Sequence, residues 1–180
     1  RLSLVGSEMC IRDSREAALG LADAAKERRD NMQEKIARVV EIINRPENKD
    51  DHFLLWHDLE AEREALCKAI PGCKAVYGSQ DDKEADKVIA DFKDGRLKYL
   101  AAKPEMLGEG LNFQYHCHKA IMFIDYRFND KFQAIARIYR FMQQHPVELY
   151  LVYAESEGEI FKSFMPVSYT HLRAHETKAN

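Results

Sequence analysis

The stretch FLLWHDLEAEREALCKAIPGCKAVY, Phe53–Tyr77, decides the fold. It opens with a short, continuous apolar run, Phe53–Trp56, of the kind that is buried on both faces in a parallel sheet. The spacing of apolar residues then predicts a helix over Leu59–Ile70, which Pro71–Gly72 ends. Lys74–Tyr77 repeats the strand pattern. Strand, helix and strand in this order predict parallel strands joined by a crossover helix.

The same alternation continues toward both ends of the chain. The pattern predicts helices over Arg15–Asn44, Asp82–Phe92 and Asn129–Gln143, and strands over Leu97–Ala101, Ala120–Ile124 and Val147–Tyr153. We therefore expect an α/β fold, an open parallel sheet with helices on both faces, preceded by a helix. Ligands of such sheets bind beyond the carboxyl ends of the strands, so the functional edge is formed by the loops after Trp56, Tyr77, Ala101 and Ile124.

Size and composition narrow the function classes. The chain has 180 residues, 46% of them hydrophobic, which is enough for one domain with a substantial core. Its net charge of -3 excludes nucleic-acid binding through bulk electrostatics, so any such contact must be local. No apolar run could span a bilayer and no cleavable signal pattern opens the chain, so we expect a cytoplasmic protein. Its cysteines lack a CxxC pairing, which argues against a zinc ribbon or a disulfide framework: Cys10, Cys67, Cys73 and Cys117.

Both ends of the chain read as foreign sequence. Leu4–Asp13, LVGSEMCIRD, and Val167–Thr177, VSYTHLRAHET, translate opposite strands of one DNA sequence that resembles a sequencing-library transposase adaptor. We therefore expect adaptor-derived tails at 1–14 and 167–180, with both natural ends missing, and assign no chemistry to Cys10, His171 or His175. Between the tails, the expected organisation is a helix and connector at 15–50 and one α/β domain at 51–166.

The predicted helix Asn129–Gln143 carries the strongest candidate for chemistry. Its stretch QAIARIYR places Arg137 and Arg140 three residues apart, hence on one face, with Gln133 beside them. Permanently charged guanidinium forks suit phosphate oxygens and the charge that spreads over a phosphoryl group during transfer. The spacing alone also fits an ordinary solvated helix face.

The loop after the third predicted domain strand contains the closest glycine pair of the chain, Gly108 and Gly110, followed by Asn112. Glycines let the backbone approach a ligand, and the asparagine amide can bond a hydroxyl or a ring edge. An ordinary turn fits equally well. No phosphate-cradling G-x-x-x-x-G-K-[ST] loop occurs anywhere, and no acidic pair follows a strand to hold magnesium, so half of a nucleotide hydrolase is missing. We expect no metal site, since His116–His118 lacks a second cluster at zinc spacing.

Two further groups lie on the expected functional edge. Gly78 and Ser79 form a turn, and with Lys103 they could hold a nucleic-acid phosphate backbone, although each also fits a solvated surface. His57 and Asp58 resemble an acid/base pair, but Asp58 is better explained as the N-cap of the following helix.

Taken together and in order, these segments resemble the C-terminal RecA-like domain of superfamily 2 helicases, in particular Swi/Snf-type helicases and related phage or mobile-element proteins. The resemblance covers roughly Lys35–Glu155. HFLLWHDLEAERE is similar to motif IV, VYGSQ to the strand and turn that follow it, LGEGLNFQ to motif V, and QAIARIYRFMQQHPVELYLV to motif VI.

The resemblance implies the second motor domain of an ATP-dependent DNA helicase or translocase, which cannot hydrolyse ATP alone. Magnesium-bound ATP would be held mainly by a preceding RecA-like domain, the partner in the same parent protein. The resemblance implies these site residues: arginine fingers Arg137 and Arg140 with Gln133 in support; Gly108, Gly110 and Asn112 at the domain cleft; and Gly78, Ser79 and Lys103 on the nucleic-acid backbone. It does not distinguish DNA from RNA, or strand separation from translocation.

The sequence departs from the family pattern at three places. Ala136 stands where relatives often have Gly or Asp, Met142 stands where Gly is usual, and the loop between Lys103 and Gly108 is about two residues longer than the family's usual pattern. These departures leave open an alternative of a different class, a non-catalytic motor-like module that binds a phosphate-bearing or protein partner.

Overall fold

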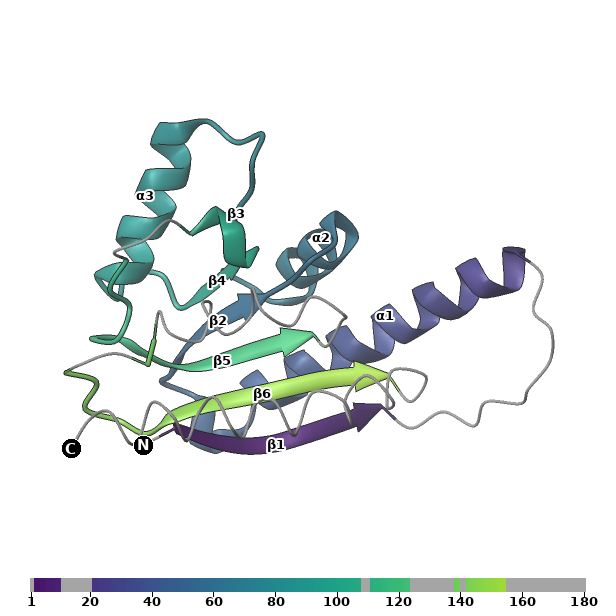
Figure 1. The fold of residues 1–180 in the computed structure, drawn as a ribbon, viewed down its shortest axis with the longest axis horizontal. Helices are drawn as coiled ribbons and strands as arrows, with labels where there is room; N and C mark the ends of the chain where they lie inside the picture. Colours follow the sequence, from purple (N-terminus) through teal and green to yellow (C-terminus); the bar gives the residue numbers. More distant parts are fainter. Residues whose placement is uncertain (1, 11–20, 108–110, 124–137, 140–141, 155–180) are drawn as a thin grey trace.

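The computed structural model describes residues 2–10, 21–107, 111–123, 138–139 and 142–154, with the backbone alone for 2–10 and 21–30. The strands form one parallel sheet in the order β1-β6-β5-β2-β4-β3 (Figure 1). The strands are β1 (Leu2–Cys10), β2 (His52–Trp56), β3 (Lys74–Val76), β4 (Tyr99–Ala102), β5 (Cys117–Phe123) and β6 (Val147–Ala154). The helices are α1 (Leu21–Ile43), η1 (Pro46–Asn48), α2 (Glu60–Ala69), α3 (Asp82–Lys93) and η2 (Pro104–Met106). The predicted parallel α/β sheet is confirmed.

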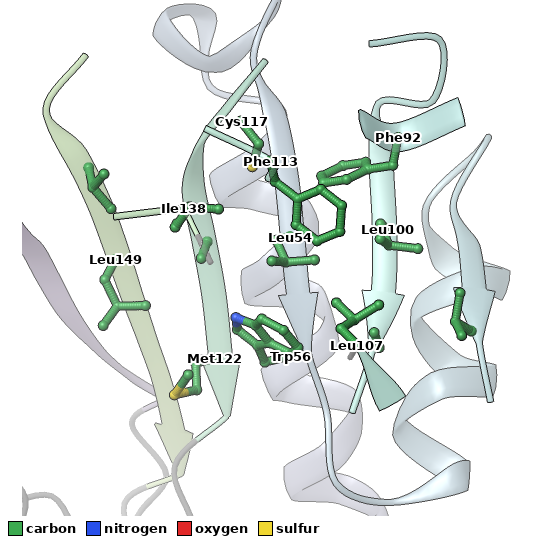
Figure 2. Packing of buried hydrophobic residues seen from close by; sticks show 14 of the residues in the cluster. Leu54, Trp56, Phe92, Leu100, Leu107, Phe113, Cys117, Met122, Ile138 and Leu149 are labelled. Carbon is green, nitrogen blue, oxygen red and sulfur yellow. The ribbon is translucent and has the colours of Figure 1, made fainter. Parts of the chain in front are cut away.

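Successive residues of a strand face opposite sides of the sheet, so they belong alternately to two hydrophobic cores. On β2, Leu54 and Trp56 face the core shown in Figure 2, whereas Phe53 and Leu55 face the other side of the sheet. The first core is covered by α3 and by Phe113, whose ring packs edge-on against Phe92 at 5.2 Å between centroids. Because both faces of the strand are buried, it reads as an unbroken apolar run in the sequence.

The second core lies under α1 and α2. Helix α1 contributes a stripe of buried residues, Ile36, Val39, Ile42 and Ile43, and α2 contributes Leu66. The spacing of this stripe is that of one helix face, as the sequence predicted. With α3 on the opposite face, the expectation of helices on both faces of the sheet is confirmed.

The start of α2 differs from the prediction. Leu59, not Asp58, occupies the N-cap position, and it makes no capping bond with its side chain. Instead the Glu62 carboxylate accepts hydrogen bonds from the backbone N–H groups of Asp58 and Leu59, at 3.0 and 3.1 Å. A carboxylate at the third helical position satisfies these N–H groups and favours the positive end of the helix dipole, so the acidic side chain that serves this helix start comes from within the helix.

The predicted helix Asn129–Gln143 lies mostly outside the described residues, but its end is wrong. Ile138 and Met142 lie in turns and Gln143 is not helical. The Gln143 side-chain amide donates to the backbone carbonyls of Cys117 and Ile138, at 3.0 and 3.1 Å. Met142 has φ 71, a left-handed conformation incompatible with a continuing helix. The predicted helix extends too far because the spacing of apolar residues continues through a position where the backbone reverses.

Met142 supplies a first prediction. Its side chain is 59% exposed, so it contributes little packing, while its left-handed backbone favours glycine. We expect Met142→Gly to raise the free energy of unfolding by about 0.5–1 kcal/mol, since relief of roughly 1–2 kcal/mol of strain exceeds the entropic cost of glycine. Urea denaturation measures this. Met106→Gly, where φ is not positive, should destabilise; a loss of stability in Met142→Gly would contradict the explanation.

Residues 2–10 form part of the sheet, which the sequence analysis did not anticipate. They make β1, an edge strand that pairs with β6 from Leu2↔Val147 to Cys10↔Ala154, with an irregularity between Leu4 and Gly6. An outer strand edge presents unpaired backbone groups that a compatible extended segment can pair with. The foreign origin of the segment stays a prediction.

The amino edge of the sheet is held by a buried ammonium group. Lys119, on β5 and 5% exposed, contacts the Asp51 carboxylate at 2.8 Å, the Glu148 carboxylate at 3.2 Å and the Asn48 side-chain oxygen at 2.6 Å. Asn48 in turn donates to the carbonyl of Ile42 near the end of α1, at 2.6 Å. Burial acts to lower the pKa of Lys119, but the two carboxylates outweigh it and raise the pKa. The network joins β5, β6, the segment before β2 and the end of α1.

Candidate functional site

Three neighbouring strands end level with one another. Trp56 on β2 and Val76 on β3 are both in register with Ala102 on β4. The backbone N–H of His57 donates to the carbonyl of Ala102 at 3.3 Å, which extends the pairing one step further. The residues that follow these strands therefore lie along one carboxyl edge, where ligands of open α/β sheets bind.

A cluster of charged side chains occupies this edge. Glu60, in the first turn of α2, contacts the Arg63 guanidinium at 2.7 Å and the Lys103 ammonium at 3.4 Å. The hydrogen bond from Arg63 lowers the pKa of Glu60, and the bond from Lys103 adds to this effect. The same Arg63–Glu60 bond raises the pKa of Arg63. The exposed carboxylate of Glu60 thus binds two cations at once. Lys103 lies at the predicted edge, and its ammonium is already paired with this carboxylate.

Arg63 also connects α2 with the turn after β3. Its guanidinium carbon lies 4.2 Å from the centre of the Tyr77 ring, a cation–π contact. Gly78 and Ser79 follow directly and are exposed. A Cβ added at Gly78 would lie 3.8 Å from the Met106 sulfur, which is ordinary contact, so this glycine also brings the turn close to η2. The predicted residues Gly78, Ser79 and Lys103 therefore lie in one region of the surface.

His57 lies beneath this cluster and is 1% exposed. Both ring nitrogens are buried without a well-formed hydrogen bond to any described residue. Burial lowers the pKa of His57 to about 4, because the charged ring would lose its hydration; the Glu60 carboxylate acts in the opposite direction but too weakly. The ring is therefore neutral at pH 7. A neutral, buried imidazole packs the edge and is poorly placed to exchange protons with solvent.

The lowered pKa gives a pH-dependence prediction. Above about pH 6.5 the ring is neutral in both states, whereas below it the unfolded chain binds a proton that the folded chain refuses until about pH 4. We expect the free energy of unfolding to fall by at most about 1.4 kcal/mol per pH unit from this residue across that window. Urea denaturation at pH 7, 6 and 5 should show a shallower slope for His57→Phe. Equal slopes for the wild-type protein and His57→Phe would contradict the prediction.

The other predicted site residues are only partly placed. Arg137, Arg140, Gln133, Gly108 and Gly110 lie outside the described residues. Asn112 is half-buried in the segment between η2 and β5, next to the buried Phe113. Within the described ranges, no group of three or more His, Cys, Asp or Glu side chains could hold a metal ion. None of the helices described there is long and apolar enough to cross a membrane.

Sequence reasoning missed Glu60 and Arg63 as site residues. Both stand within the HDLEAERE stretch, on the first turns of the helix after β2. A signal was available: an i, i+3 acid–base pair on the first turn of a crossover helix is placed at the carboxyl edge by the topology alone. The contact with Tyr77 could not be inferred, because it depends on which strands neighbour one another.

Comparison with known proteins gives structural matches only: no family model and no curated protein matches the chain. The C-terminal part of the Fun30 ATPase domain matches with a TM-score of 0.61 at 18% identity, covering 71% of this chain and 44% of that chain. An S. cerevisiae Dbp5 variant bound to a Gle1 variant and IP6 matches with a TM-score of 0.59 at 15% identity, covering 76% of this chain and 37% of that chain. The C-terminal domain of that Dbp5 variant, also bound to the Gle1 variant and IP6, matches with a TM-score of 0.59 at 12% identity, covering 76% of this chain and 79% of that chain.

The chain spans less than half the length of the first two of these structures, and about four fifths of the isolated Dbp5 domain. At these identities the likeness concerns the arrangement of the backbone. The parallel sheet with its helices is what the matches have in common with this chain. The chain thus has the RecA-like fold seen in the C-terminal part of the Fun30 ATPase domain and in the Dbp5 C-terminal domain.

Proposed function

We propose that this chain is the second motor domain of an ATP-dependent DNA helicase or translocase. The observation that carries the proposal is the RecA-like fold together with a carboxyl edge that gathers Gly78, Ser79 and Lys103 beside Arg63. Magnesium-bound ATP would be held mainly by a preceding RecA-like domain of the same parent protein. Arg137 and Arg140, supported by Gln133, would reach its γ-phosphate across the cleft, near Gly108, Gly110 and Asn112.

The nucleic-acid contacts follow from the chemistry of the edge. The exposed turn at Gly78 and Ser79 offers backbone N–H groups and a hydroxyl, and Lys103 and Arg63 offer positive charge. Such groups bind phosphates without reading sequence. Because Glu60 pairs with both cations, binding of a phosphate backbone must displace or outcompete that carboxylate. Contact with nucleic acid would therefore exchange one anion for another at the same two cations.

The test of the function is reconstitution with the other half of the motor. The full-length parent protein, or this chain joined to the domain that precedes it there, is assayed for ATP hydrolysis with and without single- and double-stranded DNA. We expect turnover that requires both domains and is stimulated by DNA, and no turnover by this chain alone. Hydrolysis by the isolated chain, or a two-domain protein that binds ATP without turnover, would refute the proposal.

Glu60→Gln provides a test at the edge itself. Removing the carboxylate frees Lys103 and Arg63 and removes repulsion of phosphate, so we expect affinity for single-stranded DNA to rise roughly three- to tenfold, with a steeper salt dependence. Fluorescence anisotropy at several salt concentrations measures both. Glu47→Gln makes the same charge change on η1 and should leave affinity within about twofold, which is the scale of a distant surface charge. Equal gains in both variants would show a bulk charge effect.

The alternative is a non-catalytic motor-like module that binds a protein or phosphate-bearing partner. The observation that favours it is that Lys103 and Arg63 both pair with Glu60. A two-domain protein that fails to hydrolyse ATP, together with a Glu60→Gln variant that gains no affinity for DNA, would favour this module over the motor.

A further inference from the structure

Two cysteines that are six positions apart in the sequence meet at the far end of α2. Cys67 lies in the last turns of the helix and Cys73 directly precedes β3. Between them Pro71 and Gly72 turn the chain, Gly72 with φ 80, and the backbone N–H of Cys73 donates to the carbonyl of Ile70 at 3.1 Å. The two sulfur atoms are 3.9 Å apart. The turn therefore aims the two thiols at each other.

The surroundings of the pair allow both access and movement. Cys67 is half-buried and Cys73 is 8% exposed, so an external reagent can reach the first more easily than the second. A disulfide needs a sulfur–sulfur distance of about 2.05 Å, so the atoms must approach by roughly 2 Å. Pro71 and Gly72 are exposed, and nothing lies within 4 Å of a Cβ built at Gly72, so the turn is free to adjust.

We propose that Cys67 and Cys73 form a reversible intramolecular disulfide by exchange with a low-molecular-weight disulfide. The Cys67 thiolate attacks one sulfur of the reagent, forming a mixed disulfide and expelling one thiolate. Cys73 then loses its proton to solvent and attacks the Cys67 sulfur, expelling the second thiolate. The protein loses two protons and two electrons, and the reagent, reduced by the two electrons, leaves as two thiols.

The electrostatics assign the order of these steps. The hydrogen bond between the two thiols lowers the pKa of Cys67 to about 7, and the charges of Arg63 and Lys74 act in the same direction. The same bond, together with burial, raises the pKa of Cys73. Cys67 is thus the attacking thiolate and Cys73 the resolving thiol. Cys117 contrasts with both, because full burial raises its pKa to about 12 and no other cysteine among the described residues lies beside it.

The consequence is a covalent link between the end of α2 and the start of β3. Helix α2 carries Glu60 and Arg63 at its other end, at the carboxyl edge. The disulfide would therefore restrain the end of helix α2 when the cysteines are oxidised and release it when they are reduced. Helix α2 is the helix that positions the charged cluster. This inference concerns the thiols alone and does not depend on the proposed motor function.

The test uses the full chain with Cys10→Ser, incubated with oxidised glutathione, then alkylated and analysed by peptide mass spectrometry. We expect a cross-linked peptide joining Cys67 to Cys73, reversed by dithiothreitol, and no retained glutathione. In the Cys73→Ser variant, glutathione should remain on Cys67. At pH 7, Cys67 should react with iodoacetamide at least about tenfold faster than Cys73 in the reduced protein.

Cys117→Ser is the matched control and should leave the cross-link unchanged. The proposal is overturned if both thiols remain free in oxidised glutathione, or if Cys67 keeps glutathione while Cys73 is intact. Circular dichroism of each variant checks folding, and the cross-link in the Cys10→Ser parent stands as evidence even if Cys73→Ser does not fold.

Discussion

Arg137→Ala or Arg140→Ala in the full-length parent is expected to lower ATP turnover by at least about 10³-fold, with ATP affinity nearly unchanged. An arginine that reaches a transferring phosphoryl group from a second domain stabilises charge that develops in the transition state, so its removal affects the rate more than binding. Steady-state hydrolysis and equilibrium binding of a fluorescent ATP analogue separate the two effects. Both arginines lie outside the described residues, so this prediction rests on the sequence and on the proposed function.

Arg96→Ala is the control for this experiment. Arg96 is exposed and forms surface ion pairs with Asp91 and Asp94, at 2.8 and 3.0 Å, after the end of α3. Its loss should change turnover less than about twofold, as expected for an exposed pair. If Arg137→Ala and Arg140→Ala behave like Arg96→Ala, the finger assignment is wrong. If they weaken ATP binding as much as turnover, the arginines hold the ground state instead.

Lys119→Met is expected to destabilise the domain by about 3 kcal/mol, lowering the melting temperature by roughly 10 °C. The methionine keeps the apolar length of the side chain but leaves the Asp51 and Glu148 carboxylates without the ammonium that joins them. Removing one partner of a buried ionic network costs more than the network itself contributes, because the remaining charges lose their compensation. Urea denaturation and a thermal melt measure the change.

Lys93→Met makes the same substitution at an exposed position in the last turn of α3, and should cost no more than about 0.5 kcal/mol. Asp51→Asn, alone and combined with Lys119→Met, completes a double-mutant cycle. We expect the double variant to lose less stability than the sum of the single variants, since the two groups contact each other. Strict additivity, or equal losses at Lys119 and Lys93, would show that the network contributes nothing specific.

Much of the fold could be predicted from the sequence, because buried strands and amphipathic helices leave periodic traces. The strand Phe53–Trp56 and the helix Asp82–Phe92 lie within one residue of β2 and α3. The order of strands in the sheet could not be predicted: an apolar run shows that a strand is buried, but not which strands flank it. The reversal at Met142 leaves no trace in the apolar periodicity; the one sign of it is that the resembled family usually has Gly at this position.

The site assignment stays a prediction, and the sequence contained no sign of the contacts that its described residues make. Topology placed Ser79 and Lys103 at the carboxyl edge, and the structure has both there. The pairing of Lys103 with Glu60 depends on how far α2 lies from the end of β4, which spacing along the chain does not specify. The Cys67–Cys73 contact could not be predicted for a similar reason. CxxC spacing does not detect two cysteines six positions apart that a turn brings together.

The strand order has a consequence for synthesis of the chain. Among the described strands, β1, β2 and β3 come before β4 in the sequence, and none of the three neighbours another in the sheet. No pair of described strands can therefore form until β4 has been synthesised, and β2 gains its second described neighbour only with β5. Until Tyr99 has been synthesised, the apolar strands β2 and β3 lack their partner β4, and their apolar side chains are open to aggregation.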